Sequence, residues 1–214
     1  MSYQDNDTVT TTITKVASDA EVEDENSPLE GLRPGARRIV DATRSLLVSS
    51  GYRNLSLEAI ANECGLHKAV IRHYFGNKAG LMALVHASYG YDSIADAANA
   101  LNELSNEPTI SGLARVKRQA AENLDAQLSL FELLPGALRG GPESAHLSWI
   151  YERLENLYVD FFAERLPDLP RCEAEGLAQT IIALVDGLSI RYAMQPEPDR
   201  LDRAFAVFEA MFST

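Results

Sequence analysis

Residues 56–78 have the sequence SLEAIANECGLHKAVIRHYFGNK, and this stretch decides the fold of the chain. Ser56 is a good helix N-cap, and the apolar positions that follow it predict a short helix ending at Cys64 and Gly65, since glycine tolerates the positive φ of a helix end. A second helix is expected from about His67 to Phe75, before Gly76 and Asn77 break it. Two short helices joined by a turn that contains glycine form a helix-turn-helix.

The second helix of this pair carries side chains suited to DNA recognition. Ile71 and Phe75 are four residues apart, so we expect them to face inward and hold the helix in place. Lys78 begins the next helix, where free backbone N–H groups favour an anion. The residues that can reach phosphates, base edges or a thymine methyl group are His67, Lys68, Ala69, Val70, Arg72, His73 and Tyr74. Spacing alone also fits an ordinary helical hairpin with solvated bases.

A further helix precedes the pair. Pro34 suits a first helical turn because its missing N–H would have no intrahelical partner. Apolar or small residues then recur every three or four positions from Ala36 to Leu47, and the Ser-Ser-Gly sequence that ends at Gly51 stops the pattern.

Charge is distributed unevenly along the chain. Its 214 residues include 19 basic and 31 acidic side chains, for a net charge of −12. Residues 1–32 carry −7, residues 33–86 carry +5 from eight bases and three acids, and residues 87–214 carry −10. We interpret residues 1–32 as a disordered acidic tail. The basic segment is where nucleic acid is expected to bind, although the whole-chain charge argues against it.

Several protein classes are disfavoured. Charge interrupts every apolar run before the roughly 20 residues that a bilayer crossing needs, and the N-terminal residues do not resemble a secretory signal. Cys64 and Cys172 are too few for a disulfide framework and have no metal-ligand spacing, and Cys64 fits a small buried residue better than a redox switch. We therefore expect a cytoplasmic protein with no metal, cofactor or catalytic residue, and keep a helical enzyme as an alternative.

The basic segment resembles the DNA-binding domain of TetR-family transcriptional regulators. The residues that carry the resemblance are Gly51 and Tyr52, 55–61, 65–75, Asn77, Lys78 and Leu81, and the most specific part is HYF, two residues, then K. The resemblance implies an all-α homodimer with a three-helix DNA-binding domain at 33–80 and a helical ligand-binding and dimerisation domain at 81–214. It also implies repression that a small effector relieves.

The resemblance assigns roles to individual residues. Ser56, Tyr74 and Lys78 match positions that usually contact the phosphate backbone, and the groove-facing positions are matched by Lys68, Ala69, Val70 and His73. The family commonly has a small hydroxyl residue in place of His67 and Val70, and an aromatic one in place of Arg72. These departures prevent a prediction of the operator sequence.

Helices are expected at 79–104, 109–134, 143–166 and 171–194, followed by a terminal helix, with residues 135–142 as a loop or a short broken helix. The last two helices each carry two apolar stripes, whereas a helix that meets only its own core needs one. The residues predicted for a two-fold, four-helix subunit interface are Leu177, Ile181, Leu184, Leu188, Leu201, Phe205, Phe208 and Phe212. Central helices of a monomer are the alternative.

An effector pocket is expected between helices of the regulatory domain. Its candidate lining residues are Tyr89, Phe131, His146, Trp149, Tyr158 and Phe162. Aromatic residues at helical spacing are more often core than pocket, but their abundance favours a mostly apolar effector.

Taken together, the sequence and its resemblance to the TetR family imply a ligand-responsive repressor that binds a palindromic, double-stranded operator as a homodimer. A sequence-nonspecific architectural DNA-binding protein is the main alternative, and the overall acidity makes its binding weak.

Overall fold

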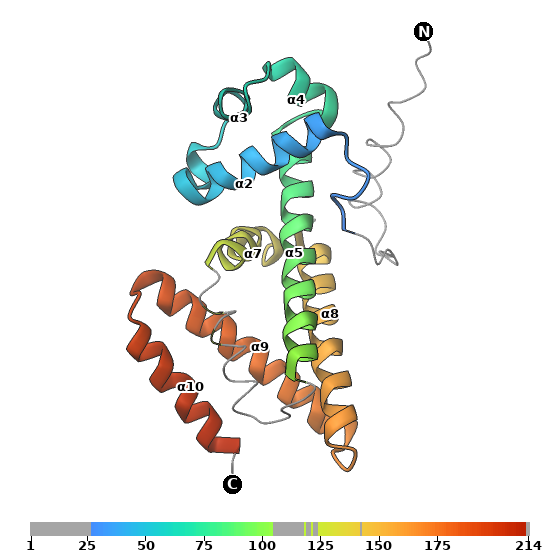
Figure 1. Cartoon of the computed structure of the whole chain (residues 1–214), viewed down its shortest axis with the longest axis vertical. Helices are drawn as coiled ribbons and strands as arrows, with labels where there is room; N and C mark the ends of the chain where they lie inside the picture. The colour runs from blue at the N-terminus through green and yellow to red at the C-terminus, as the bar shows by residue number, and fades with distance from the viewer. Residues whose placement is uncertain (1–26, 105–117, 119–120, 122–123, 142, 213–214) are drawn as a thin grey trace. The chain divides into compact units, whose positions relative to one another are not determined.

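The computed structural model describes residues 27–104, 118, 121, 124–141 and 143–212, whose regular secondary structure consists of helices (Figure 1). The predicted all-α class is confirmed. The helices are α2 (Pro34–Asn54), α3 (Leu57–Cys64), α4 (Lys68–Phe75), α5 (Lys78–Glu103), α7 (Leu124–Ala137), α8 (Glu143–Arg165), α9 (Arg171–Met194) and α10 (Pro198–Phe212). Residues 1–26 of the expected acidic tail and the expected helix start near residue 109 lie outside the described residues.

The chain forms two compact units. The described part of the first unit comprises residues 27–91 and 132–146 without 142, and the second unit holds the remaining described residues. Helices α5, α7 and α8 contribute residues to both units, with α7 passing from the second to the first at Glu132. The boundary predicted at residue 80 stays a prediction.

Helix α2 begins at Pro34, as the sequence predicted. Its backbone leaves helical geometry at Gly51, where φ is 71° and ψ is 164°, and a last turn follows to Asn54. The chain before α2 differs from the prediction of a disordered tail up to residue 32. The side chain of Leu29 is only 4% exposed and packs in the core of the first unit.

The local signals of the helix-turn-helix are confirmed. The Ser56 hydroxyl oxygen accepts a hydrogen bond from the Ala59 N–H at 3.1 Å and caps α3. Gly65 ends this helix in the left-handed conformation, with φ 62° and ψ 35°. Helix α4 begins at Lys68, one residue later than expected, and His67 is its N-cap.

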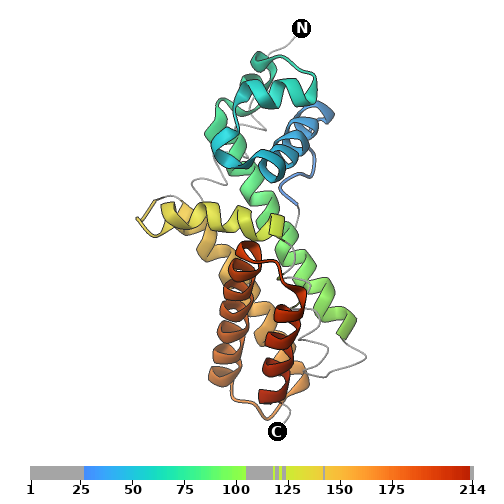
Figure 2. The same cartoon turned by 90° about the vertical axis from the view of Figure 1, so that its left-hand side faces the viewer.

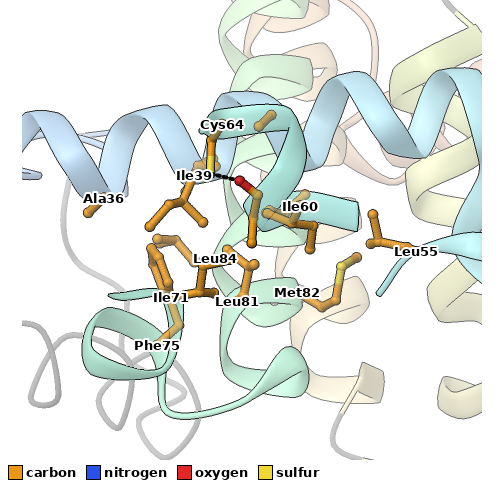
Figure 3. Packing of buried hydrophobic residues seen from close by; sticks show 14 of the residues in the cluster. Ala36, Ile39, Leu55, Ile60, Cys64, Ile71, Phe75, Leu81, Met82 and Leu84 are labelled. Atoms are coloured by element: carbon orange, nitrogen blue, oxygen red, sulfur yellow. Dashed lines mark hydrogen bonds between the residues drawn. The ribbon is translucent and has the colours of Figure 1, made fainter. Parts of the chain in front are cut away.

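The core of the first unit joins α2, α3, α4 and the start of α5 (Figure 3). Ile39, Ile60 and Ile71 come from three different helices and are fully buried. Phe75 is buried with Ile71, so the inward face predicted for α4 is confirmed. Cys64 is also buried, with its thiol sulfur 3.7 Å from the Ala61 carbonyl oxygen, as expected of a small core residue.

The second unit contains the antiparallel pair α9 and α10, which lie side by side in Figure 2. Together with Tyr158, Val159 and Phe162 of α8, they enclose a second hydrophobic core. Helix α9 is long and apolar enough to cross a bilayer by length and composition, although Asp186 and Arg191 interrupt it. A core helix of a soluble protein meets the same criteria, and α9 packs into this core through Ala178, Ile181 and Val185.

Helix α7 corrects one prediction. The sequence indicated that Pro135 and Gly136 end this helix, but it continues through Pro135 to Ala137. Proline here removes the N–H that would bond to the carbonyl of residue 131, so α7 gives up one hydrogen bond at Pro135. The last turn of α7 is closed by hydrogen bonds from the Leu138 N–H to the Leu134 carbonyl at 2.9 Å and from the Arg139 guanidinium to the Pro135 carbonyl at 3.1 Å.

Candidate DNA-binding interface

Helix α4 has one buried and one exposed face. Ile71 and Phe75 anchor the buried face in the core, which fixes the orientation of the helix. Ala69, Arg72 and His73 are exposed on the other side. Two potential hydrogen-bond donors and a small side chain are therefore open to a partner, as base recognition in a DNA groove requires.

Val70 and Tyr74 lie at the edge between these faces. Both are partly buried and pack against the core of the first unit. A Cβ atom at Gly35 would lie 3.2 Å from the Tyr74 hydroxyl oxygen, so this hydroxyl sits beside the first turn of α2. Ala69 is consequently the more accessible of the two small apolar residues that the sequence placed at the groove.

Lys68 forms an ion pair with Glu58 of α3, a contact that the sequence analysis missed. The hydrogen bond from Lys68 and its positive charge hold the pKa of Glu58 below its usual value. Both side chains are well exposed, so the pair is weak, and a DNA phosphate or base edge could replace Glu58 as the partner of Lys68.

Ser56 and His67 occupy the N-terminal ends of the two helices. The Ser56 hydroxyl oxygen is used as an acceptor within the cap, but its hydrogen remains available to a phosphate because a hydroxyl can donate and accept together. The side chain of His67 is exposed and makes no capping hydrogen bond.

Lys78 is held by Tyr52, another contact that the sequence analysis did not foresee. The ammonium group donates to the Tyr52 carbonyl oxygen at 3.4 Å and lies 4.2 Å from the centre of the Tyr52 ring. The ring face attracts the cation. Tyr52 entered the sequence analysis only through the Gly-Tyr pair of the family motif, which was the one available signal for it.

Helix α2 and the residue before it carry basic side chains for which the sequence predicted no individual contact with DNA. Arg33, Arg37 and Arg38 are exposed near its N-terminus. The Arg37 guanidinium reaches the Leu29 carbonyl oxygen at 3.4 Å, and Arg44 lies over the Tyr89 ring at 4.1 Å from its centre.

Comparison with known families identifies this arrangement. Residues 39–85, which include α3 and α4, match the family model described as bacterial regulatory proteins, tetR family. Residues 131–214 match the model of the BetI-type transcriptional repressor C-terminal region. The chain is a TetR-family transcriptional regulator. This family consists of regulators rather than enzymes, so the enzyme alternative is set aside.

Relatives of this TetR-family regulator match along most of its length. It is 28% identical to the HTH-type transcriptional regulator BetI of Agrobacterium fabrum, covering 86% of this chain and 90% of the relative. It is also 28% identical to BetI of Klebsiella pneumoniae, covering 84% and 92%.

Solved structures share the fold of the regulator. A transcriptional regulator from Rhodococcus superposes with a TM-score of 0.67 at 17% identity, covering 82% of this chain and 94% of that one. The multidrug binding protein EbrR complexed with proflavin has a TM-score of 0.55 at 21% identity, covering 81% and 96%.

The six residues predicted to line an effector pocket fall in different units of the regulator. Tyr89 and His146 belong to the first unit, and Phe131, Trp149, Tyr158 and Phe162 to the second. Tyr158 and Phe162 are buried in the second core, which agrees with the expectation that aromatic residues at helical spacing are more often core than pocket. None of the six lines the groove of about 490 Å³ between α9 and α10, whose lining includes Leu188, Tyr192 and Arg200.

Buried titratable groups occur in both units. Burial, followed by the nearby His146, lowers the pKa of His86 to about 4. In the second unit the Tyr151 hydroxyl donates to the Asp186 carboxylate at 2.9 Å, and burial together with this neighbour raises the pKa of Tyr151. Among the described residues, no group of three or more His, Cys, Asp or Glu side chains is placed to hold a metal ion.

The residues predicted for the subunit interface lie in or against the core of the second unit, apart from Phe212. Ile181, Leu201, Phe205 and Phe208 are buried in the core of their own unit, as the monomer alternative supposed. Leu177, Leu184 and Leu188 pack against the same core while partly exposed, and the side chain of Phe212 lies outside the described residues. Ala178 and Val185, from the second apolar stripe of α9, are buried in the same core.

A further face of α9 and part of α10 are exposed. The residues of this surface on α9 are Thr180, Ala183, Gly187, Ile190 and Met194, and those on α10 are Ala206, Val207 and Ala210. Ile190, Met194 and Val207 are 41%, 69% and 61% exposed. We call these eight residues the outer face of α9 and α10.

Proposed function

We propose that this TetR-family regulator is a repressor that binds a palindromic operator as a homodimer, with α4 of each subunit in the major groove. The observation that carries the proposal is the exposed face of α4, with Ala69, Arg72 and His73 on a helix whose other face is anchored in the core. A helix held in this way can read base edges because its angle to the domain is fixed.

We assign the affinity for DNA and the preference for a particular DNA sequence to different residues. Lys78 and Ser56 lie at the starts of α5 and α3, where backbone N–H groups add to their attraction for phosphate. Phosphate contacts position the protein without reading sequence, whereas contacts with base edges discriminate. Lys68, Ala69 and His73 are the residues we assign to the groove.

The outer face of α9 and α10 is where we place the subunit interface. Exposed apolar side chains such as Ile190, Met194 and Val207 are costly to leave in water, and a second copy would cover them. Small residues such as Ala183 and Gly187 allow two helices to approach closely. Dimerisation also places two recognition helices on one face of the duplex, which a palindromic site requires.

A small effector would release the operator. The matched C-terminal model is named for a transcriptional repressor, and the structurally similar EbrR binds proflavin, an aromatic compound. The aromatic side chains of the second unit suit a mostly apolar effector of comparable character. A cytoplasmic location follows from action on chromosomal DNA.

The proposal is tested by measuring binding of the full chain to many duplexes of different sequence. Lys78→Ala should weaken binding to all of them alike, whereas His73→Ala should change their order of preference. Excess random DNA at moderate salt separates this proposal from the architectural alternative, because only sequence-specific binding survives that competition. Equal losses on every duplex for both variants would contradict the division of roles.

A further inference from the structure

The last turn of α2 and the start of α5 meet at the contact between Tyr52 and Lys78. The Lys78 ammonium group donates to the Tyr52 carbonyl oxygen at 3.4 Å and lies 4.2 Å from the centre of the Tyr52 ring. Tyr52 is 45% exposed, and Lys78 is partly buried. The ammonium group is therefore held at the surface of the first unit, where a phosphate can reach it.

Local backbone features fix both sides of this contact. Gly51 has φ 71° and ψ 164°, a conformation that favours glycine, and it sets the last turn of α2 apart from the rest of that helix. The Leu55 N–H closes this turn on the Tyr52 carbonyl oxygen at 3.2 Å. On the other side, the Asn77 side chain caps α5 by accepting from the Gly80 N–H at 2.9 Å. Each backbone segment is thus fixed by its own hydrogen bonds.

Tyr52 holds the ammonium group without cancelling its charge. A carbonyl oxygen and the face of a phenol ring are both neutral, and the ring attracts the cation through its quadrupole. An ammonium group has three donors, of which the carbonyl oxygen takes one, so the others stay available to a phosphate. Lys68 differs in this respect, because its partner is the Glu58 carboxylate, which a phosphate would have to replace.

We propose that Tyr52 is a positioning residue for the DNA phosphate that Lys78 contacts. This inference rests on the proposed DNA interface and adds to it a residue that acts through Lys78. A mobile lysine side chain loses rotamer freedom when it binds a phosphate, and this loss lowers the affinity. Tyr52 imposes part of that loss in the free protein, so DNA binding is stronger than it would be with a mobile lysine.

The test measures binding of the full chain to a fluorescent duplex of random sequence, because every sequence presents the phosphate assigned to Lys78. The proteins are the parent, Tyr52→Leu, Tyr52→Phe, Lys78→Ala and the double variant Tyr52→Leu/Lys78→Ala. Leucine removes the ring, whereas phenylalanine keeps the ring face and loses only the hydroxyl group. Val48→Ala is the control, since it shortens another exposed apolar side chain of α2. Thermal unfolding confirms that each variant is folded.

We expect Tyr52→Leu to bind the duplex about two- to tenfold more weakly than the parent, the range that ordering one flexible side chain supports. Tyr52→Phe should bind like the parent. In the Lys78→Ala background, Tyr52→Leu should cost no more than Val48→Ala does. Equal losses in both backgrounds would show that Tyr52 does not act through Lys78. A loss as large for Tyr52→Phe would show that the hydroxyl group matters instead of the ring, and either result overturns the inference.

Nuclear magnetic resonance of lysine-labelled protein tests the positioning without DNA. Protons above an aromatic ring face resonate upfield, so the ε-methylene protons of Lys78 should be shifted upfield in the parent and in Tyr52→Phe, but not in Tyr52→Leu. An unshifted parent signal would overturn the inference. If Lys78→Ala weakens DNA binding and Tyr52→Leu does not, only the inference fails. If Lys78→Ala leaves binding unchanged, the proposed phosphate contact fails, and the role of Tyr52 fails with it.

Discussion

Acidification should destabilise the first unit through His86. This histidine is 6% exposed on α5, and its pKa is lowered to about 4 from an ordinary value of 6.5. The folded protein therefore holds His86 neutral at pH values where the unfolded chain protonates it. Above pH 6.5 His86 is neutral in both states and does not lower the free energy of unfolding. As the pH falls below 6.5 this free energy decreases, and the loss is complete below about pH 4.

The size of the effect follows from the two pKa values. A difference of about 2.5 units, at 1.36 kcal/mol per unit, corresponds to a maximum loss of about 3 kcal/mol. At pH 5 the same values give a loss of about 2 kcal/mol relative to pH 7.5. Burial also lowers the pKa of His146, which adds to the loss in the same direction.

Urea unfolding followed by circular dichroism at pH 7.5 and pH 5 measures this loss. His86→Gln should lose about 2 kcal/mol less than the parent between these two pH values. His73→Gln is the matched control, because it removes an exposed imidazole from the same unit and leaves the buried pair intact. If His86→Gln loses as much stability as the parent and the control, the explanation through His86 is refuted.

Three other predictions concern the core, the subunit interface and the tail. Ile60→Ala should cost about 3 kcal/mol of unfolding free energy in a denaturant titration, because a fully buried side chain leaves a cavity; a cost below about 1 kcal/mol would contradict its place in the core. Ile190→Glu and Val207→Glu should yield monomers in sedimentation. Leu166 is an exposed apolar residue elsewhere, and Leu166→Glu should leave the dimer intact. If the first two variants stay dimeric, the outer face is not the subunit interface. Removal of residues 1–26, which carry seven carboxylates and one lysine, should strengthen binding to random DNA, and unchanged affinity would make the tail passive.

Local sequence signals predicted the helix-turn-helix well. Three features depend only on neighbours within one or two helical turns, so they can be predicted from the local sequence. They are the cap at Ser56, the left-handed conformation of Gly65 and the inward spacing of Ile71 and Phe75. Pro135 was misread for a related reason. The cost of proline depends on its position within the helix, and the hydrogen bonds that close the last turn of α7 are not visible in a pattern of residue types.

Contacts between segments that are distant in the chain could not be predicted from the sequence pattern. Lys68 and Lys78 were both predicted to contact DNA, but nothing indicated that Glu58 pairs with the first or that Tyr52 contacts the second. Both apolar stripes of α9 pack in the core of the second unit, so the stripe pattern alone did not indicate which residues remain exposed. The packing of α9 against α8 and α10 shows which of its residues are core.

Selection of duplexes from a random library by the full-length protein tests the central claim most directly. The account predicts enrichment of a palindromic sequence whose half-sites are about one helical turn apart, and a changed half-site when His73→Ala replaces the parent. Failure of the parent to enrich any sequence, although it binds DNA, would contradict sequence reading by the exposed face of α4.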